Sequence, residues 1–217
     1  MQYNELKEMH RARRGASVPA LSLRIHRSLS WLKKAEQSEN DLDAKFIFLW
    51  IAFNAAYAVD VDEQYRSTEK RMFEQFFMKL VELDSGHEIY DLVWDDFSGL
   101  VRSLLDNQYI FQPFWDYHNG YISEEQWQSR FKASKKRATV ALAQQDTVVV
   151  LSILFRRVYT LRNQVMHGGA TDNSSANREQ LKSCTALLEK MIPLILEIMI
   201  KNDHQEWGDP FYPLVNG

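Results

Sequence analysis

Cysteine is almost absent from this 217-residue sequence, in which Cys184 is the only one. A single cysteine cannot form an intrachain disulfide, and a reducing compartment is the natural interpretation. Neither HxxxH spacing nor a neighbouring cysteine is found at His10, His26, His87, His118 or His204, so we predict no metal site and no cofactor. A chain of this length can bury a hydrophobic core without such support.

Long apolar runs are also lacking. The most apolar stretches, FIFLWIAF and TVVVLSILF, are too short to span a bilayer. The first residues, MQYNELKEMHRARRG, carry charge where a secretory signal has an apolar segment. We therefore expect a soluble, cytoplasmic protein with no membrane partner.

An excess of positive charge is missing as well, because the formal net charge is -3. The chain as a whole does not attract nucleic acid, so an RNA partner requires a local basic patch. Composition alone neither establishes nor excludes RNA binding.

Glycine and proline are scarce, with eight and five residues, and runs of good helix formers fill the chain. This composition predicts an all-α protein. No repeat or linker divides it, so we expect a single-domain helical bundle of seven or eight helices over residues 17–203. Residues 1–16 are interpreted as a loose basic arm and residues 204–217 as a C-terminal tail.

Two helices stand out in the pattern. The segment beginning at Ala44 is apolar on nearly every side and is predicted to be central, which leaves Asn54 in need of a hydrogen-bond partner. That partner is either a neighbouring backbone group or the region around Arg162. A second helix is predicted from Asp146 to the glycine pair. Its first residues are β-branched, but leucine and valine residues recur along it at helical spacing.

The end of that second helix reads TLRNQVMHGG, residues 160–169. Basic residues followed by glycine are typical of any helix C-terminus. However, Arg156, Asn163 and His167 project away from the apolar stripe, and Phe155 and Tyr159 lie between the two sides. A second face that mixes aromatic and basic groups favours a dimer contact or a ligand groove.

The chemistry of this set suits phosphodiester cleavage without a metal ion. Histidine can move the proton of a ribose 2′-hydroxyl or of a leaving 5′-oxygen, and arginine offers a planar fork to phosphoryl oxygens. Asn163 lies four residues before His167 and could orient the imidazole or the phosphate. Two copies across a two-fold axis would supply both an acid and a base.

Arg162-Asn163, three intervening residues and His167 at the end of a late helix resemble the signature of HEPN (higher eukaryote and prokaryote nucleotide-binding) domains. The segment SLSWLKKAEQSENDLDAKFIFLWIAFNAAYAV is similar to the opening helices of the Apea-like subgroup. The resemblance implies a dimeric, metal-independent ribonuclease in a toxin–antitoxin or antiviral-defence system. It assigns phosphate binding to Arg162, acid–base catalysis to His167 and a supporting role to Asn163. HEPN toxins controlled by a nucleotidyltransferase often carry a tyrosine two places after the histidine, where this chain has Gly169.

Other basic and aromatic residues are candidates for RNA contact. Lys132, Lys135 and Lys136 share one side of a predicted helix, and Arg156 and Tyr159 lie beside the motif. A solvated charged face is the alternative for the lysines.

We therefore predict a homodimeric endoribonuclease that cuts RNA through 2′-hydroxyl attack and that has an antitoxin or regulatory protein as a further partner. The alternative is a non-catalytic HEPN-like module that binds a nucleotide or a protein. An unrelated helical bundle with an accidental motif is a third hypothesis.

Overall fold

The computed structural model describes residues 2–15, 17–58, 69–175 and 177–213. Most of these residues are helical, as the abundance of helix formers in the sequence predicts. Over these ranges the chain forms ten α-helices and one π-helical segment, with no β-strand. The predicted all-α class is confirmed. The elements are α1 (Tyr3–Arg13), α2 (Pro19–Glu36), α3 (Leu42–Tyr57), α4 (Glu69–Leu83), α5 (Glu88–Asp91), η2 (Leu92–Asp96), α6 (Ser98–Leu105), α7 (Gln112–His118), α8 (Glu124–Ala143), α9 (Thr147–Met166) and α10 (Arg178–Lys201).

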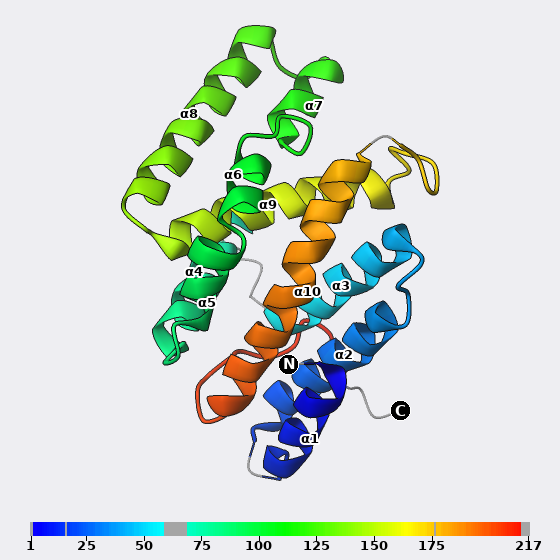
Figure 1. The fold of residues 1–217 in the computed structure, drawn as a ribbon, viewed down its shortest axis with the longest axis vertical. Helices are drawn as coiled ribbons and strands as arrows, with labels where there is room; N and C mark the ends of the chain where they lie inside the picture. The colour runs from blue at the N-terminus through cyan, green and yellow to red at the C-terminus, as the bar shows by residue number, and fades with distance from the viewer. Residues whose placement is uncertain (1, 16, 59–68, 176, 214–217) are drawn as a thin grey trace.

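The core forms where the apolar helix α3 meets α2, α4, α9 and α10. Figure 1 shows the long helix α10 crossing α9, with α2 and α3 beside it. Phe53 of α3 lies at the centre, its ring centroid 4.6 Å from that of Phe155 in α9. Phe73 and Phe77 of α4 pack against the same rings. The central position predicted for this apolar helix is thus observed.

Asn54 does not need the buried partner that the sequence predicted, because its side chain is exposed on α3. The helix is covered on most sides but not at this position. The expectation that Asn54 must find a hydrogen-bond partner in the core or near Arg162 is therefore wrong.

The N-terminal segment, interpreted from the sequence as a loose arm, contains α1 packed on the body of the protein. Leu6 is fully buried, and the His10 ring nitrogen Nε2 lies 3.1 Å from the hydroxyl of the buried Ser22. Arg13 donates a hydrogen bond of 3.2 Å to the carbonyl of Lys201 at the end of α10. Apolar and polar contacts together hold α1 against α2 and α10.

The C-terminal tail is held by a buried arginine. Arg24 of α2 donates to the carbonyls of Trp207 and Gly208 in the tail and to that of Ala56 in α3. Trp207 is itself buried, and its ring lies 6.5 Å from that of Phe76. The tail thereby covers part of the aromatic core.

The stretch from Glu88 to Asp106 is divided into α5, η2 and α6. Both carboxylate oxygens of Asp84 accept backbone N–H groups at the start of α5, from Glu88 at 3.1 Å and Ile89 at 2.7 Å. Further along, the N–H of Phe97 donates to the carbonyl of Leu92, five residues back, which widens the helix into a π turn. Division of this stretch raises the number of helices above the seven or eight expected.

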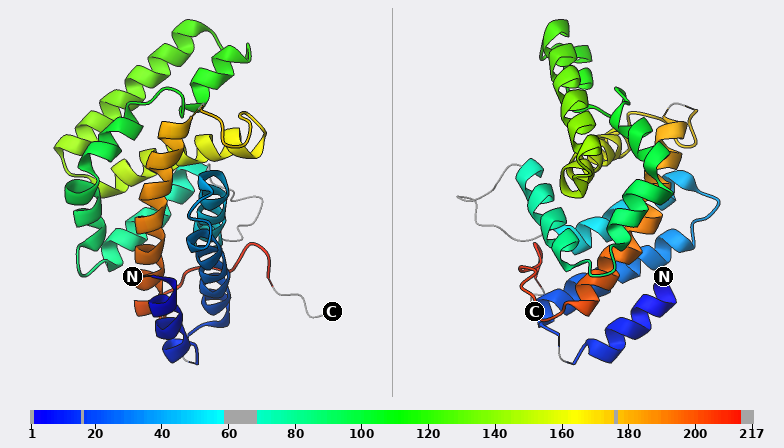
Figure 2. Two further views of the ribbon diagram at one scale, coloured as in Figure 1. Left: turned by 45° about the vertical axis from the view of Figure 1, so that its right-hand side comes forward. Right: turned by 60° about the vertical axis from the view of Figure 1, so that its left-hand side comes forward.

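The α7–α8 hairpin stands out from the rest of the molecule (Figure 2). Its helices pack on each other through aromatic rings, with Phe114 5.3 Å from Trp127. The capping box predicted at Ser123 and Gln126 is present at the start of α8. Among the described helices, none combines the length and apolar character of a membrane span.

Candidate functional site

The motif lies at the end of α9, whose β-branched start is helical as the residue spacing predicts. Asp146 caps the helix, its carboxylate accepting the N–H of Val149 at 3.0 Å. Leu151, Leu154 and Val158 are fully buried along one side. Helix α9 therefore runs through the core and emerges with residues 162–167.

The glycine pair ends α9 in a Schellman motif. The N–H of Gly169 donates to the carbonyl of Gln164 at 2.7 Å, and that of Gly168 donates to Val165 at 3.3 Å. Gly168 has a φ of 70°, in the left-handed region, and a Cβ on Gly169 would lie 2.9 Å from the carbonyl oxygen of Gln164. The glycines are thus required by the helix end itself, which places His167 at the C-cap.

The structure brings Arg162 and Asn163 together. Arg162 Nη1 donates to Asn163 Oδ1 at 3.0 Å, and its guanidinium carbon lies 5.7 Å from the centre of the Tyr159 ring. Its Nε is buried and has no hydrogen-bond partner among the described residues. His167 is exposed one turn further on, and its ring makes no hydrogen bond within the described part of the chain. Asn163 therefore orients the arginine rather than the imidazole.

The second face of α9 is covered by the protein's own helices over most of its length. Phe155 is fully buried among rings of α3 and α4, and Tyr159 lies 5.8 Å from Trp50 of α3. The expectation that Phe155 needs a second chain or a ligand is wrong, because α3 and α4 supply its cover. Only the last turn, with Met166 and His167, remains exposed.

The predicted RNA-binding lysines lie on a different helix from the motif. Lys132, Lys135 and Lys136 are exposed on α8. Lys135 pairs with Asp106 and lies 5.8 Å from the Phe131 ring centre. Figure 1 shows α8 leaving the N-terminal end of α9, whereas the motif is at the other end. The structure does not gather these lysines with Arg162 and His167.

Arg157 is the functional candidate that the sequence analysis missed. Unlike Arg156, which is half-buried and donates to the Ser152 carbonyl at 3.3 Å, Arg157 is only 3 % exposed. Burial lowers its pKa to about 10. An arginine pair directly after the apolar run TVVVLSILF was the available signal, because a cation inside an apolar helix requires partners.

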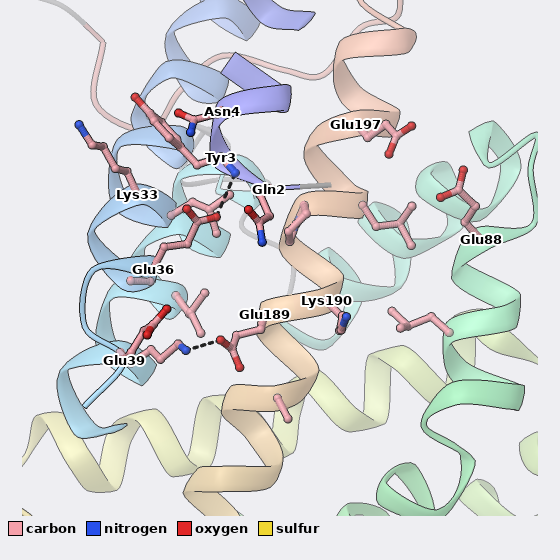
Figure 3. Close-up of a pocket in the computed structure, with 18 of the residues that line it drawn as sticks. Gln2, Tyr3, Asn4, Lys33, Glu36, Glu39, Glu88, Glu189, Lys190 and Glu197 are labelled. Atoms are coloured by element: carbon pink, nitrogen blue, oxygen red, sulfur yellow. Dashed lines mark hydrogen bonds and ion pairs between the residues drawn. The ribbon is translucent and has the colours of Figure 1, made fainter. Parts of the chain in front are cut away.

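A cavity of about 1000 Å³ lies between α1, α2, α10 and η2 and is shown in Figure 3. Several carboxylates line it, and three of them already have partners. Glu36 accepts the N–H of Tyr3 at 2.9 Å, Glu189 pairs with Lys45, and Glu197 pairs with Lys201 at 2.5 Å. These contacts give three of the cavity's acidic residues a structural role, and none of its lining residues belongs to the motif.

One acidic group lies near the loop after α9. Carboxylate oxygens of Asp41, Asp43 and Asp172 come within 4.8 Å of one another. Asp41 caps α3 by accepting the N–H of Ala44 at 2.9 Å, and Asp43 pairs with Arg178 at 2.8 Å. Two of the three carboxylates thus serve the fold, and we assign no metal to this group.

No family model matches the chain, and a search of curated proteins and of solved structures finds no significant match. The resemblance to HEPN domains therefore rests on the residues of this sequence alone.

Proposed function

We propose that this protein is a metal-independent endoribonuclease of HEPN type, with Arg162, Asn163 and His167 as its catalytic set. The observation that supports this most directly is the geometry at the end of α9. There an oriented guanidinium and an exposed imidazole lie within the last turns of one helix. An imidazole titrates near neutral pH, and a guanidinium is always charged, as acid–base cleavage of a phosphodiester requires.

Cleavage proceeds by transfer within the RNA strand. One His167 accepts the proton of the 2′-hydroxyl, whose oxygen attacks the adjacent phosphorus. The 5′-oxygen leaves with a proton from the second His167, supplied by another copy of the chain. Arg162 neutralises the non-bridging oxygens as charge develops. The products are a 2′,3′-cyclic phosphate and a 5′-hydroxyl.

The test is RNA cleavage in EDTA by the wild type, His167→Ala and Arg162→Ala. Loss of the acid–base group is expected to lower the rate on the order of 10²- to 10⁴-fold. Met166→Ala is the matched control, because Met166 is an exposed neighbour in the same turn and carries no ionisable group. Equal activity in all four proteins would end the assignment.

Light scattering of the same four proteins tests the dimer. A composite site predicts that the active species is a dimer and that the rate per chain falls on dilution below its dissociation constant. A toxin–antitoxin or antiviral setting, with an inhibitory protein partner, is the biological context that the HEPN resemblance suggests.

A non-catalytic module is the second candidate, and one contact favours it. Asn163 Oδ1 is engaged by Arg162 within the same chain, which is also what a purely structural helix end would require. This alternative predicts that Arg162→Ala lowers stability or dimerisation, while the wild type cuts no RNA.

A further inference from the structure

A second, separate site is indicated by a pocket of about 410 Å³ between the start of α7, the middle of α8 and the middle of α9. Four arginines line it, Arg130 and Arg137 from α8 and Arg156 and Arg157 from α9. The other walls are largely apolar and include Ile110, Phe111, Pro113, Ala133 and Ile153. Its volume falls within the range of small-molecule sites.

Arg157 is the buried cation of this pocket. Its Nη2 donates to the Leu105 carbonyl and to the Ser134 hydroxyl, both at 3.3 Å, and its Nε has no partner among the described residues. The guanidinium carbon lies 4.3 Å from the centre of the Phe111 ring. Arg157 is thus fixed in place by neutral groups and keeps unused donor capacity.

Two carboxylates lie near the arginines of the pocket. Glu74 pairs with Arg137 at 2.7 Å, and Asp106, whose charge acts on Arg157, forms its ion pair with Lys135. Arg130 is exposed on α8, whereas the buried Arg157 forms no ion pair within the described part of the chain and donates only to a carbonyl and a hydroxyl. Because buried charges in proteins are normally paired, a buried cation that has only neutral hydrogen-bond partners beside a cavity points to an anionic ligand.

We propose that this pocket binds a phosphate monoester with an apolar or aromatic body, whose phosphate is held by Arg130, Arg156 and Arg157. Several guanidinium forks suit the multiple oxygens of a phosphate better than a single carboxylate. The apolar walls leave room for the rest of the ligand. A nucleotide, free or at the 5′ end of an RNA strand, has this chemistry.

The proposal goes beyond ribonuclease activity and does not depend on it. Arg156 precedes Asn163 by seven residues, a rise of about 10 Å along the helix. The pocket and the cleavage motif are therefore at different positions along α9. Ligand binding in the pocket can be measured in a variant that has no ribonuclease activity.

Calorimetry with the full chain and three probes tests the ligand class. Adenosine 5′-monophosphate carries both the phosphate and the aromatic body, ribose 5-phosphate lacks the aromatic body, and adenosine lacks the phosphate. We expect the monophosphate to bind at least about tenfold more tightly than either of the others, since charge-assisted hydrogen bonds contribute about that much. Adenosine binding as tightly as the monophosphate, or no saturable binding of the monophosphate, would overturn the proposal.

Variants then locate the site. Arg130→Gln and Arg156→Gln are each expected to weaken monophosphate binding about tenfold or more, and Ala133→Trp fills the pocket without removing charge. Arg102→Gln is the matched control, because it removes the same charge from an exposed position of α6 outside the pocket. Unchanged melting temperatures show that the variants fold. Equal weakening by Arg102→Gln and Arg156→Gln would contradict a specific site.

A 5′-phosphorylated RNA trinucleotide distinguishes the two sources of the ligand, measured on His167→Ala protein so that cleavage plays no part. Tighter binding than the monophosphate, lost in Ala133→Trp, identifies an RNA strand as the ligand. Binding no tighter than the monophosphate identifies the free nucleotide. A trinucleotide that binds equally well to the Ala133→Trp protein would count against this pocket.

Discussion

The middle and the C-terminal end of α9 carry arginines in opposite settings. Arg157 lies under α7 and α8, held by a carbonyl, a hydroxyl and aromatic rings. Arg162 lies near the open end, bonded to its neighbour Asn163 and half-buried against Tyr159. Five residues of one helix separate a cation enclosed by the fold from one that borders solvent.

The motif and the fold therefore make separate demands on α9. The middle of the helix, around Arg157, connects the α7–α8 hairpin to the body of the protein, so its substitution affects stability first. The solvent-facing side of the last turns, with Arg162 and His167, contributes little packing, so its substitution affects chemistry first.

Arg157→Ala is expected to cause the largest loss, about 2 to 4 kcal/mol of unfolding free energy. It removes two hydrogen bonds, leaves a buried carbonyl without its donor and opens a void between Phe111 and Phe131. Arg162→Ala should cost less than about 1 kcal/mol. Urea denaturation measures both losses, and equal losses would remove the contrast between the middle and the end of α9.

Gly169→Ala is expected to cost about 1 to 2 kcal/mol, because the new Cβ would lie 2.9 Å from a backbone carbonyl oxygen that cannot move without breaking the helix end. The same substitution at Gly99 is the control. Gly99 lies in α6 with nothing within 4 Å of its Cβ position, so alanine there should raise stability by about 0.5 to 1 kcal/mol. Thermal melts that move in the same direction for both variants would contradict this prediction.

His10, like Arg157, is a buried basic residue, but it changes its protonation state in an accessible pH range. Burial, with smaller contributions from His26 and Arg14, lowers the pKa of His10 below its ordinary value of 6.5. The unfolded chain therefore takes up a proton before the folded one, and stability falls as pH drops from 6.5 toward the folded pKa. Unfolding measured at a series of pH values should show this slope flattened in His10→Gln.

Leu6→Ala provides the control for that slope. Leu6 is fully buried on the same helix but does not titrate, so its loss should lower stability at every pH and leave the slope unchanged. If the slope also flattened in Leu6→Ala, local unfolding of α1 rather than His10 would be its cause.

His167→Gln is expected to have the smallest effect on stability, within about 0.5 kcal/mol, because its side chain is exposed and the helix end is held by backbone bonds. Paired with the cleavage assay, this variant separates chemistry from folding. A stability loss as large as that of Arg157→Ala would assign His167 to the fold.

Local signals in the sequence predicted much of this structure. The all-α class, the helical course of α9 and the capping box at Ser123 follow from composition, spacing and short-range hydrogen bonds. The cover over Phe155 could not be predicted in this way, because it comes from Phe53 of α3 and Phe77 of α4. These rings lie about a hundred and about eighty residues earlier in the chain and meet Phe155 only on folding.

The sequence predicted the motif at the end of α9 but not the pocket around Arg157, because only the motif is formed by residues close together in the chain. Residues 162 to 169 form one local unit, so the neighbours Arg162 and Asn163 and the glycine stop were accessible from spacing. The pocket around Arg157 joins three helices with residues from Ile110 to Thr160, and no short pattern encodes it. The sequence showed the cation, but the pocket depends on the packing of the α7–α8 hairpin.

The contact between Arg24 and the tail has a consequence for biosynthesis. Arg24 is synthesised 183 residues before Trp207, so it reaches the carbonyls of Trp207 and Gly208 only after the tail has been made. Until then the Ala56 carbonyl is the only one of these three acceptors within its reach, and the rings around Phe76 lack their cover. A nascent chain on the ribosome therefore cannot complete its core before the tail has been synthesised.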